Sequence, residues 1–223
     1  MEPDRIGKNL AAVRQRIAAA AERGGRDPAG VTLVAVSKTF PAEAVIAAYR
    51  AGQQEFGENR VQEAEPKIAA VAAAGLQPRW HLIGHLQTNK VRKAVQNFAI
   101  IESVDSLPLA EAIARRAPRR MPVLVEVNVA AEPAKTGLAL EQAEGAVAAM
   151  RALEKLEVRG LMTVAPLVAD AEEVRPVFRQ LADLARRLEL PELSMGMSGD
   201  FEVAIEEGAT IVRIGTAIFG HRT

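Results

Sequence analysis

Two charged residues stand out because they lie in segments that are otherwise apolar. Lys38 follows Val34 and Val36 on the same side of an extended run, since side chains alternate along a strand. A lysine that continues a buried row is unfavourable unless it is paired or neutral. Burial favours the neutral amine, which is the nucleophile that Schiff-base chemistry requires. Lys38 is therefore a candidate Schiff-base residue, and a strand-end lysine that extends into solvent is the alternative.

Arg213 is the second candidate, and it lies inside the run of residues 211–214. A strand in a helix-covered parallel sheet is buried on both faces. A guanidinium in such a strand must pair with an acid or bind a ligand. The sequence leaves both interpretations open.

A candidate phosphate cradle follows the last two predicted strands. Ser198-Gly199-Asp200 opens a helix, and Gly215-Thr216 comes directly after the final strand. Glycine allows a ligand to approach the backbone closely, and hydroxyl groups can donate hydrogen bonds. Backbone N–H groups at a helix N-terminus attract anions. The pattern predicts a phosphate site, although the same residue types are common in ordinary turns.

His81 and His85 have the i, i+4 spacing of helical zinc ligands. They flank a strand end and Gly84, however, and this spacing converges on a metal only when both residues lie on a helix. We therefore predict no metal site.

The elements that must position these residues alternate along the chain. We expect strands over 31–36, 55–58, 80–83, 99–104, 123–129, 158–164, 193–197 and 210–214. We expect helices over 6–23, 41–52, 61–74, 109–116, 140–153 and 201–207. Two further helices are expected: one that Thr88 caps, and one that begins at a capping box of Asp170 and Glu173 and runs to residue 188. Strict alternation predicts a parallel sheet. Eight units favour a single (β/α)8 TIM barrel with an extra N-terminal helix, and an open doubly wound sheet is the alternative.

Composition narrows the class of protein. The chain has 223 residues, with 28 basic and 28 acidic side chains and no cysteine. Disulfides and thiolate chemistry are excluded, and nothing suggests a nucleic-acid partner. No apolar run reaches the roughly 18 residues of a membrane span, and the charged stretch Met1 to Arg5 does not resemble a secretory signal. We expect one cytoplasmic domain over residues 1–223.

Several motifs, taken together, resemble the pyridoxal phosphate homeostasis protein family. They run in order over nearly the whole chain: Val34-Ala35-Val36-Ser37-Lys38, Phe56-Gly57-Glu58-Asn59, residues 80–90, Ser194-Met195-Gly196-Met197-Ser198, and residues 212–220. The resemblance implies a barrel similar to the N-terminal domain of alanine racemase. Arg60 is a departure, because relatives often carry tyrosine at this position.

The resemblance also implies roles for individual residues. Lys38 would carry pyridoxal 5'-phosphate (PLP) as an internal aldimine, and Arg213 would face the pyridine nitrogen. The remaining residues would hold the phosphate (Ser198, Gly215 and Thr216) or line the cofactor pocket (Asn59, His85 and Met197).

The predicted site favours a carrier of the cofactor over an enzyme. An arginine can donate to a pyridine nitrogen but hardly protonates it, which leaves a weaker electron sink. In alanine racemases a second acid/base, a tyrosine, comes from a C-terminal domain and a neighbouring subunit. Here the chain ends three residues after Gly220, and the only tyrosine, Tyr49, lies on the first barrel helix.

We therefore expect a protein that buffers PLP or delivers it to apo-enzymes, and that is monomeric because it lacks the domain that builds racemase dimers. A weak amino-acid racemase is the first alternative. A Schiff-base aldolase acting on a phosphorylated sugar through Lys38 is the second.

Overall fold

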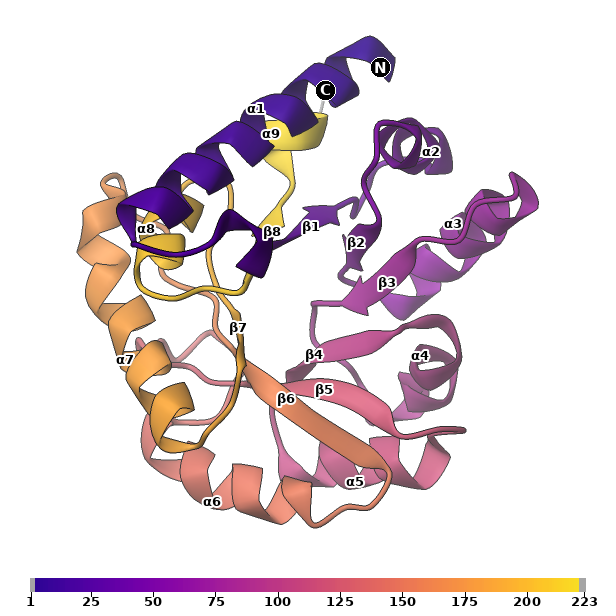
Figure 1. Cartoon of the computed structure of the whole chain (residues 1–223). Helices are drawn as coiled ribbons and strands as arrows, with labels where there is room; N and C mark the ends of the chain where they lie inside the picture. The colour runs from indigo at the N-terminus through magenta and orange to yellow at the C-terminus, as the bar shows by residue number, and fades with distance from the viewer. Residues whose placement is uncertain (1–2, 221–223) are drawn as a thin grey trace.

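The computed structural model describes residues 3–220, so part of the stretch 1–5 and both ends of the expected domain 1–223 lie outside the described residues. Eight parallel strands pair in chain order and close into a barrel, with helices arranged around it (Figure 1). The strands are β1 (Thr32–Val36), β2 (Glu55–Glu58), β3 (Arg79–Leu82), β4 (Ile100–Val104), β5 (Met121–Glu126), β6 (Leu156–Met162), β7 (Glu192–Ser194) and β8 (Ile211–Ile214). The predicted barrel is confirmed, and the open sheet is excluded because β1 pairs with β8.

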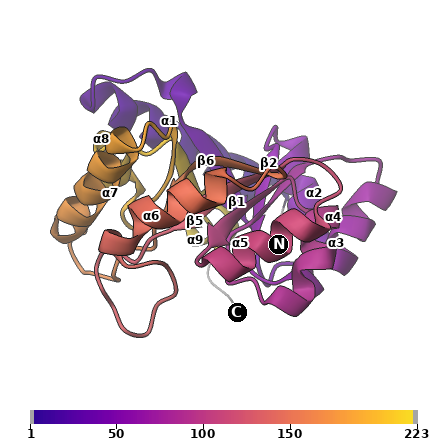
Figure 2. The ribbon, with the colours of Figure 1, turned by 90° about the horizontal axis from the view of Figure 1, so that it is seen from below.

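The helices alternate with the strands, as expected. They are α1 (Pro3–Arg23), α2 (Ala42–Arg50), α3 (Val61–Ala73), α4 (Val91–Asn97), α5 (Leu107–Arg116), α6 (Leu140–Arg151), α7 (Arg175–Arg187), α8 (Phe201–Glu206) and α9 (Thr216–Phe219). The described residues also form three short 3₁₀ helices: η1 (Pro28–Gly30), η2 (Thr88–Lys90) and η3 (Ala171–Val174). Seen from below, the helices flank the strands on both sides (Figure 2).

The core has two layers because each strand alternates its side chains. One large cluster of buried apolar residues fills the space between the strands and the helices. A smaller cluster, made of Val34, Ile100, Leu124, Met162 and Ile211, fills the barrel interior. Strands that are covered on both faces are shielded from water, which explains why β4 and β5 are buried at every position, including the polar residues Glu102, Ser103 and Glu126.

Two local predictions were wrong and one was confirmed. Thr88 does not cap a helix, because it is the first residue of η2 and the α-helix begins three residues later. The last strand is followed by the short helix α9, which the sequence analysis did not predict. The capping box of Asp170 and Glu173 does form, on η3 directly before α7. Within residues 3–220, no helix combines the length and apolar character needed to cross a membrane.

Candidate functional site

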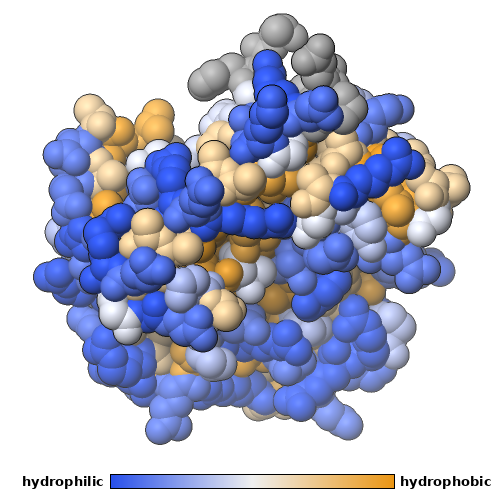
Figure 3. Space-filling model, turned by 45° about the horizontal axis from the view of Figure 1, so that its top comes forward, coloured by the Kyte–Doolittle hydropathy of each residue, from blue (hydrophilic) through white to orange (hydrophobic). Residues whose placement is uncertain are grey.

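The carboxyl ends of β1, β7 and β8 surround a cavity of about 320 Å³. Its polar wall contains the predicted residues Lys38, Met197, Ser198, Arg213, Gly215 and Thr216, together with Gly199 and Asp200. Its remaining wall is mostly apolar and includes Ile83 and the segment 166–168. On the face drawn in Figure 3, hydrophilic residues predominate and apolar ones show between them near its middle. The structure thus brings the Schiff-base candidate, the buried arginine and both glycine loops to one cavity.

Lys38 is exposed, which corrects the expectation that it continues the buried row of Val34 and Val36. Strand β1 ends at Val36, two residues before Lys38, so the strict alternation no longer applies at residue 38. The amine reaches the cavity from its rim.

The backbone around Lys38 is held firmly although its side chain is not. Ser37 is buried, and its hydroxyl donates to Glu58 Oε1 at 2.6 Å. The ammonium of Lys67, on α3, donates to the Ser37 carbonyl at 2.6 Å and forms a buried ion pair with Glu58 at 2.5 Å. On the other side, Thr39 has a φ of 68°, which is strained for a β-branched residue. Such strain persists only where the surrounding structure fixes the backbone.

Arg213 is only 4% exposed, and its guanidinium is fixed by two hydrogen bonds. One terminal nitrogen, Nη1, donates to the Ser194 hydroxyl at 2.6 Å, and Nη2 donates to the Thr163 carbonyl at 2.8 Å. The Ser194 hydroxyl in turn donates to Glu102 Oε2 at 2.5 Å. Burial lowers the pKa of Arg213, against the charges of Glu102 and other acids, but an arginine remains protonated under all ordinary conditions.

The same network continues through the barrel interior to the opposite end of the strands. His81, on β3, donates from Nδ1 to Glu102 Oε1 at 2.5 Å and from Nε2 to Glu55 Oε2 at 2.8 Å. Burial opposes the charged imidazole, but the hydrogen bonds to Glu102 and Glu55 outweigh it and raise the pKa of His81 to about 9. Burial likewise opposes the Glu102 carboxylate, and the bond to His81 outweighs it and lowers the pKa of Glu102. The side chains of this network therefore alternate in charge: Glu55 is negative, His81 positive, Glu102 negative and Arg213 positive.

The two glycine loops approach each other on the far wall of the cavity. The Ser198 hydroxyl accepts from the Ala217 amide at 3.4 Å, which joins the loop after β7 to the first turn of α9, directly after β8. Within residues 3–220, the amides of Ser198 and Gly199 donate to no acceptor. A methyl group at Gly199 would meet nothing within 4 Å. These free donors and this open space suit the oxygens of a phosphate group.

Asp200 is the acid nearest to these loops, and it is largely buried. Its Oδ1 accepts from the Met197 amide at 2.5 Å. Burial raises the pKa of Asp200, although the hydrogen bond from Met197 opposes this change. Its carboxylate thus orders the loop that precedes α8.

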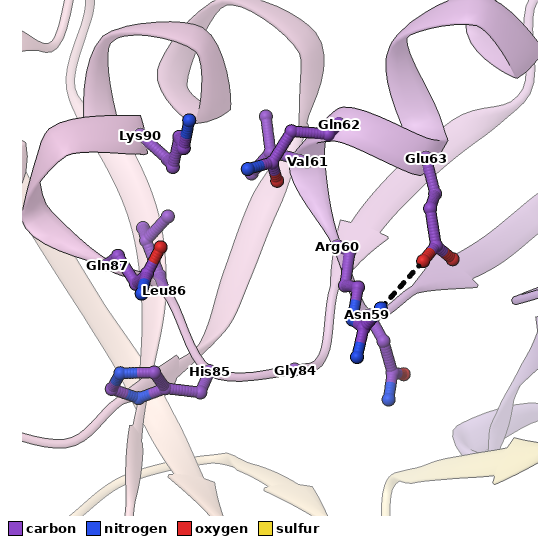
Figure 4. A pocket seen from close by; sticks show the side chains of 10 residues that line it. All are labelled: Asn59, Arg60, Val61, Gln62, Glu63, Gly84, His85, Leu86, Gln87 and Lys90. Atoms are coloured by element: carbon purple, nitrogen blue, oxygen red, sulfur yellow. Dashed lines mark hydrogen bonds and ion pairs between the residues drawn. The ribbon is translucent and has the colours of Figure 1, made fainter.

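Asn59 and His85 lie outside the Lys38 cavity, in two neighbouring cavities. The larger measures about 560 Å³ and is lined by both residues together with Arg60 and Lys90 (Figure 4). The smaller measures about 290 Å³ and adds Glu126 to its walls. His85 is half-exposed and pairs with Asp105 at 3.0 Å. Ile83 is shared by the smaller cavity and the Lys38 cavity, so these two adjoin.

The described part of the chain contains no group of three His, Cys, Asp or Glu side chains suited to a metal ion.

Sequence reasoning missed two residues, Glu102 and Lys67. Glu102 interrupts an apolar strand in the same way as Arg213 does, so the same signal could have found it. Lys67 shares the buried face of α3 with Ala64 and Val71, at helical spacing.

Comparison with known proteins first defines the class. The family model described as alanine racemase, N-terminal domain, matches residues 8–223. An alanine racemase from Clostridium difficile has the same fold at 15% identity and a TM-score of 0.72, over 98% of this chain and 57% of that one.

Closer relatives then define the family. A pyridoxal phosphate homeostasis protein from Aquifex aeolicus is 44% identical, covering 96% of this chain and 97% of the relative. One from Pseudomonas aeruginosa is 45% identical, over 97% and 96%. The solved structure of PipY from Synechococcus elongatus with PLP bound is 40% identical, with a TM-score of 0.83 over 96% of this chain and 100% of that one. The chain belongs to the pyridoxal phosphate homeostasis protein family.

Proposed function

We propose that this protein binds PLP as a Schiff base on Lys38 and buffers or delivers it, without turning over a substrate. The observation that carries this proposal is the convergence of Lys38, Arg213 and two glycine loops on one cavity of about 320 Å³. The PLP bound to PipY, a relative of similar length, supports it.

The residues present fit the chemical groups of the cofactor. The phosphate would lie against Ser198, Gly199, Gly215 and Thr216, where amide and hydroxyl donors are available. Arg213 has N–H groups beyond the two that Ser194 and Thr163 occupy, and these would face the ring nitrogen. When bound, PLP supplies an aldehyde carbon with which amines condense.

Asn59, His85 and Met197 have different places in this proposal. Met197 lines the cavity itself. Asn59 and His85 would border the cofactor from the adjoining cavity, across Ile83.

The exposure of Lys38 supports a carrier. An amine that stands at the rim is accessible to solvent and to incoming amines, which suits a bond to the cofactor that has to form and exchange. In the described chain, the walls of this cavity carry only Lys38, Asp200 and Arg213 as ionisable groups. Tyr49 lies on α2 and does not line the cavity. A racemase needs a second acid/base, and this wall offers no tyrosine for that role.

We further propose that the protein works as a cytoplasmic monomer that hands PLP to apo-enzymes. Light scattering at micromolar concentration tests the monomer. A stable dimer would contradict it.

Titration of the protein with PLP, followed by absorbance, tests the Schiff base. We expect a band at the edge of the visible range that Lys38→Ala abolishes and Lys90→Ala retains, since Lys90 lines the neighbouring cavity instead. Exchange of the α-proton of alanine in deuterated water should be no faster than with free PLP. A band that persists in Lys38→Ala, or protein-dependent exchange, would contradict the proposed function.

A further inference from the structure

The smaller neighbouring cavity, of about 290 Å³, has a polar wall of its own. It lies between the end of β5 with the segment that follows it and the loops after β2 and β3. Ile83 is the side chain that it shares with the Lys38 cavity, so a ligand there would be a neighbour of the proposed cofactor.

Glu126, the last residue of β5, lines this cavity and carries an unpartnered oxygen. The residue is 6% exposed. Its Oε1 accepts from the Thr136 hydroxyl at 2.7 Å, whereas its Oε2 is buried and has no hydrogen-bond partner among residues 3–220. A buried carboxylate oxygen without a donor is unfavourable. Burial, with a further contribution from the charge of Asp105, raises the pKa of Glu126.

Asn59 also lines this cavity and carries a second unpartnered acceptor. Its Oδ1 is buried, and no donor within the described chain reaches it. In Figure 4 the Asn59 side chain points away from Gln62 and Lys90, which lie on the other side of the larger cavity. Two acceptors without donors, one of them a carboxylate, call for a ligand that is rich in N–H groups and positively charged.

The cations around Glu126 are engaged elsewhere. Lys135 pairs with Glu132 and donates to the Val164 carbonyl at 3.2 Å. His85 pairs with Asp105, and Arg213 is held by Ser194 and Thr163. Among the described side chains, none forms an ion pair with Glu126. Its carboxyl group is therefore available to a ligand.

We propose that this cavity binds the primary ammonium group of a small amine, with Glu126 Oε2 and Asn59 Oδ1 as acceptors. An ammonium group has three donors and no acceptor, so one such group supplies enough donors for both oxygens. A divalent metal ion fits less well, because it requires about six oxygen ligands and the described residues offer no such group. The site needs no cofactor and goes beyond the proposed function.

Carbon-13 NMR of the cofactor-free protein, labelled at the glutamate carboxyl carbons, tests this site with n-propylamine as the probe. n-Propanol is the neutral control of similar shape. We expect n-propylamine to lower the apparent pKa of Glu126, whose signal is assigned by its absence in Glu126→Gln, and n-propanol to leave this pKa unchanged.

Four variants sharpen the test, with binding followed at the side-chain amide of Asn59. Glu126→Gln keeps the shape and removes the charge, and should weaken amine binding ~10-fold. Glu63→Gln, an exposed carboxylate of the larger cavity, should not change it. Lys38→Ala should also bind the amine normally, which separates this site from the proposed function. Lys135→Met should bind at least as well as the unmodified protein.

Three outcomes would overturn the ammonium site. One is that n-propylamine does not shift the pKa of Glu126. Another is that n-propanol shifts this pKa equally, or that folded Glu126→Gln binds n-propylamine as well as the unmodified protein does. The third is binding that appears only in Lys135→Met, which would mean that the Lys135 ammonium occupies the cavity itself. Thermal melting of Glu126→Gln establishes that this variant is folded, and a glutamine side chain is nearly isosteric with the glutamate that it replaces.

Discussion

The two sides of the Lys38 cavity differ sharply in how they hold their charged groups. On the β1 side, the amine of Lys38 stands at the exposed rim, and only the backbone beneath it is fixed, through Ser37 and the buried pair of Glu58 and Lys67. On the β8 side, Arg213 is buried and connected through Ser194 to Glu102 and His81. Under the proposed function, the buried β8 side would orient the cofactor and the exposed β1 side would exchange it.

The buried β8 side should be the most sensitive to mutation. Glu102→Ala leaves two cations, His81 and Arg213, without the carboxylate between them. Removing one member of a buried charge network costs about 5 kcal/mol at the upper end of such losses. Urea unfolding should show this decrease, whereas Glu63→Ala, which loses an exposed pair with Arg60, should cost less than about 1 kcal/mol. A loss as small as that of the control would show that the network contributes little.

The second largest loss of stability should follow from breaking the buried ion pair that fixes the backbone beneath Lys38. Lys67→Met keeps the packing of the side chain but leaves Glu58 buried without its cation, at a cost of about 4 kcal/mol. The exposed pair of Lys93 and Glu65 provides the control, since Lys93→Met should cost under about 1 kcal/mol. Equal losses in the two variants would remove the distinction between the buried anchor and a surface pair.

His81 should make stability depend on pH. Its pKa rises from 6.5 in an unfolded chain to about 9 in the folded protein, so its contribution is fully present below pH 6.5 and is lost as the pH rises through 9. The full contribution is about 3 kcal/mol. Unfolding free energies between pH 6 and 10 should therefore fall in the unmodified protein and in His85→Gln, an exposed histidine. His81→Gln should flatten this dependence, and an unchanged slope would contradict a charged His81.

The exposed rim of the cavity should matter least for stability. Leu167 lines the cavity but is 99% exposed, so Leu167→Ser removes almost no buried surface. Its unfolding free energy should change by less than about 0.5 kcal/mol. A larger loss, measured in the same urea series, would show that the rim packs more tightly than its exposure indicates.

The barrel could be predicted from the sequence because each buried strand is a short apolar run between amphipathic helices. The carboxyl ends of parallel strands meet at one face of a barrel, and this rule was enough to predict that Lys38, Arg213 and Ser198 lie around one cavity. It was not enough to place Asn59 and His85, because the loops after β2 and β3 direct these side chains into adjoining cavities.

Exposure was harder to predict than position. Alternation indicates which side of a strand a residue takes, but it does not indicate where the strand ends, and Lys38 lies two residues beyond β1. The charge of Glu102 inside an apolar strand was a signal in the sequence, but the partners of Glu102 and Lys67 come from other elements and could not be predicted: His81 and Ser194 for Glu102, and Glu58 and Ser37 for Lys67.

The most direct measurement of the central claim is to reduce the PLP-loaded protein with borohydride and to map the modified lysine by mass spectrometry. We expect the added mass on Lys38 and none on Lys67, whose ammonium is buried against Glu58, or on Lys135. A label on another lysine, or none after loading, would contradict a Schiff base at the rim of this cavity.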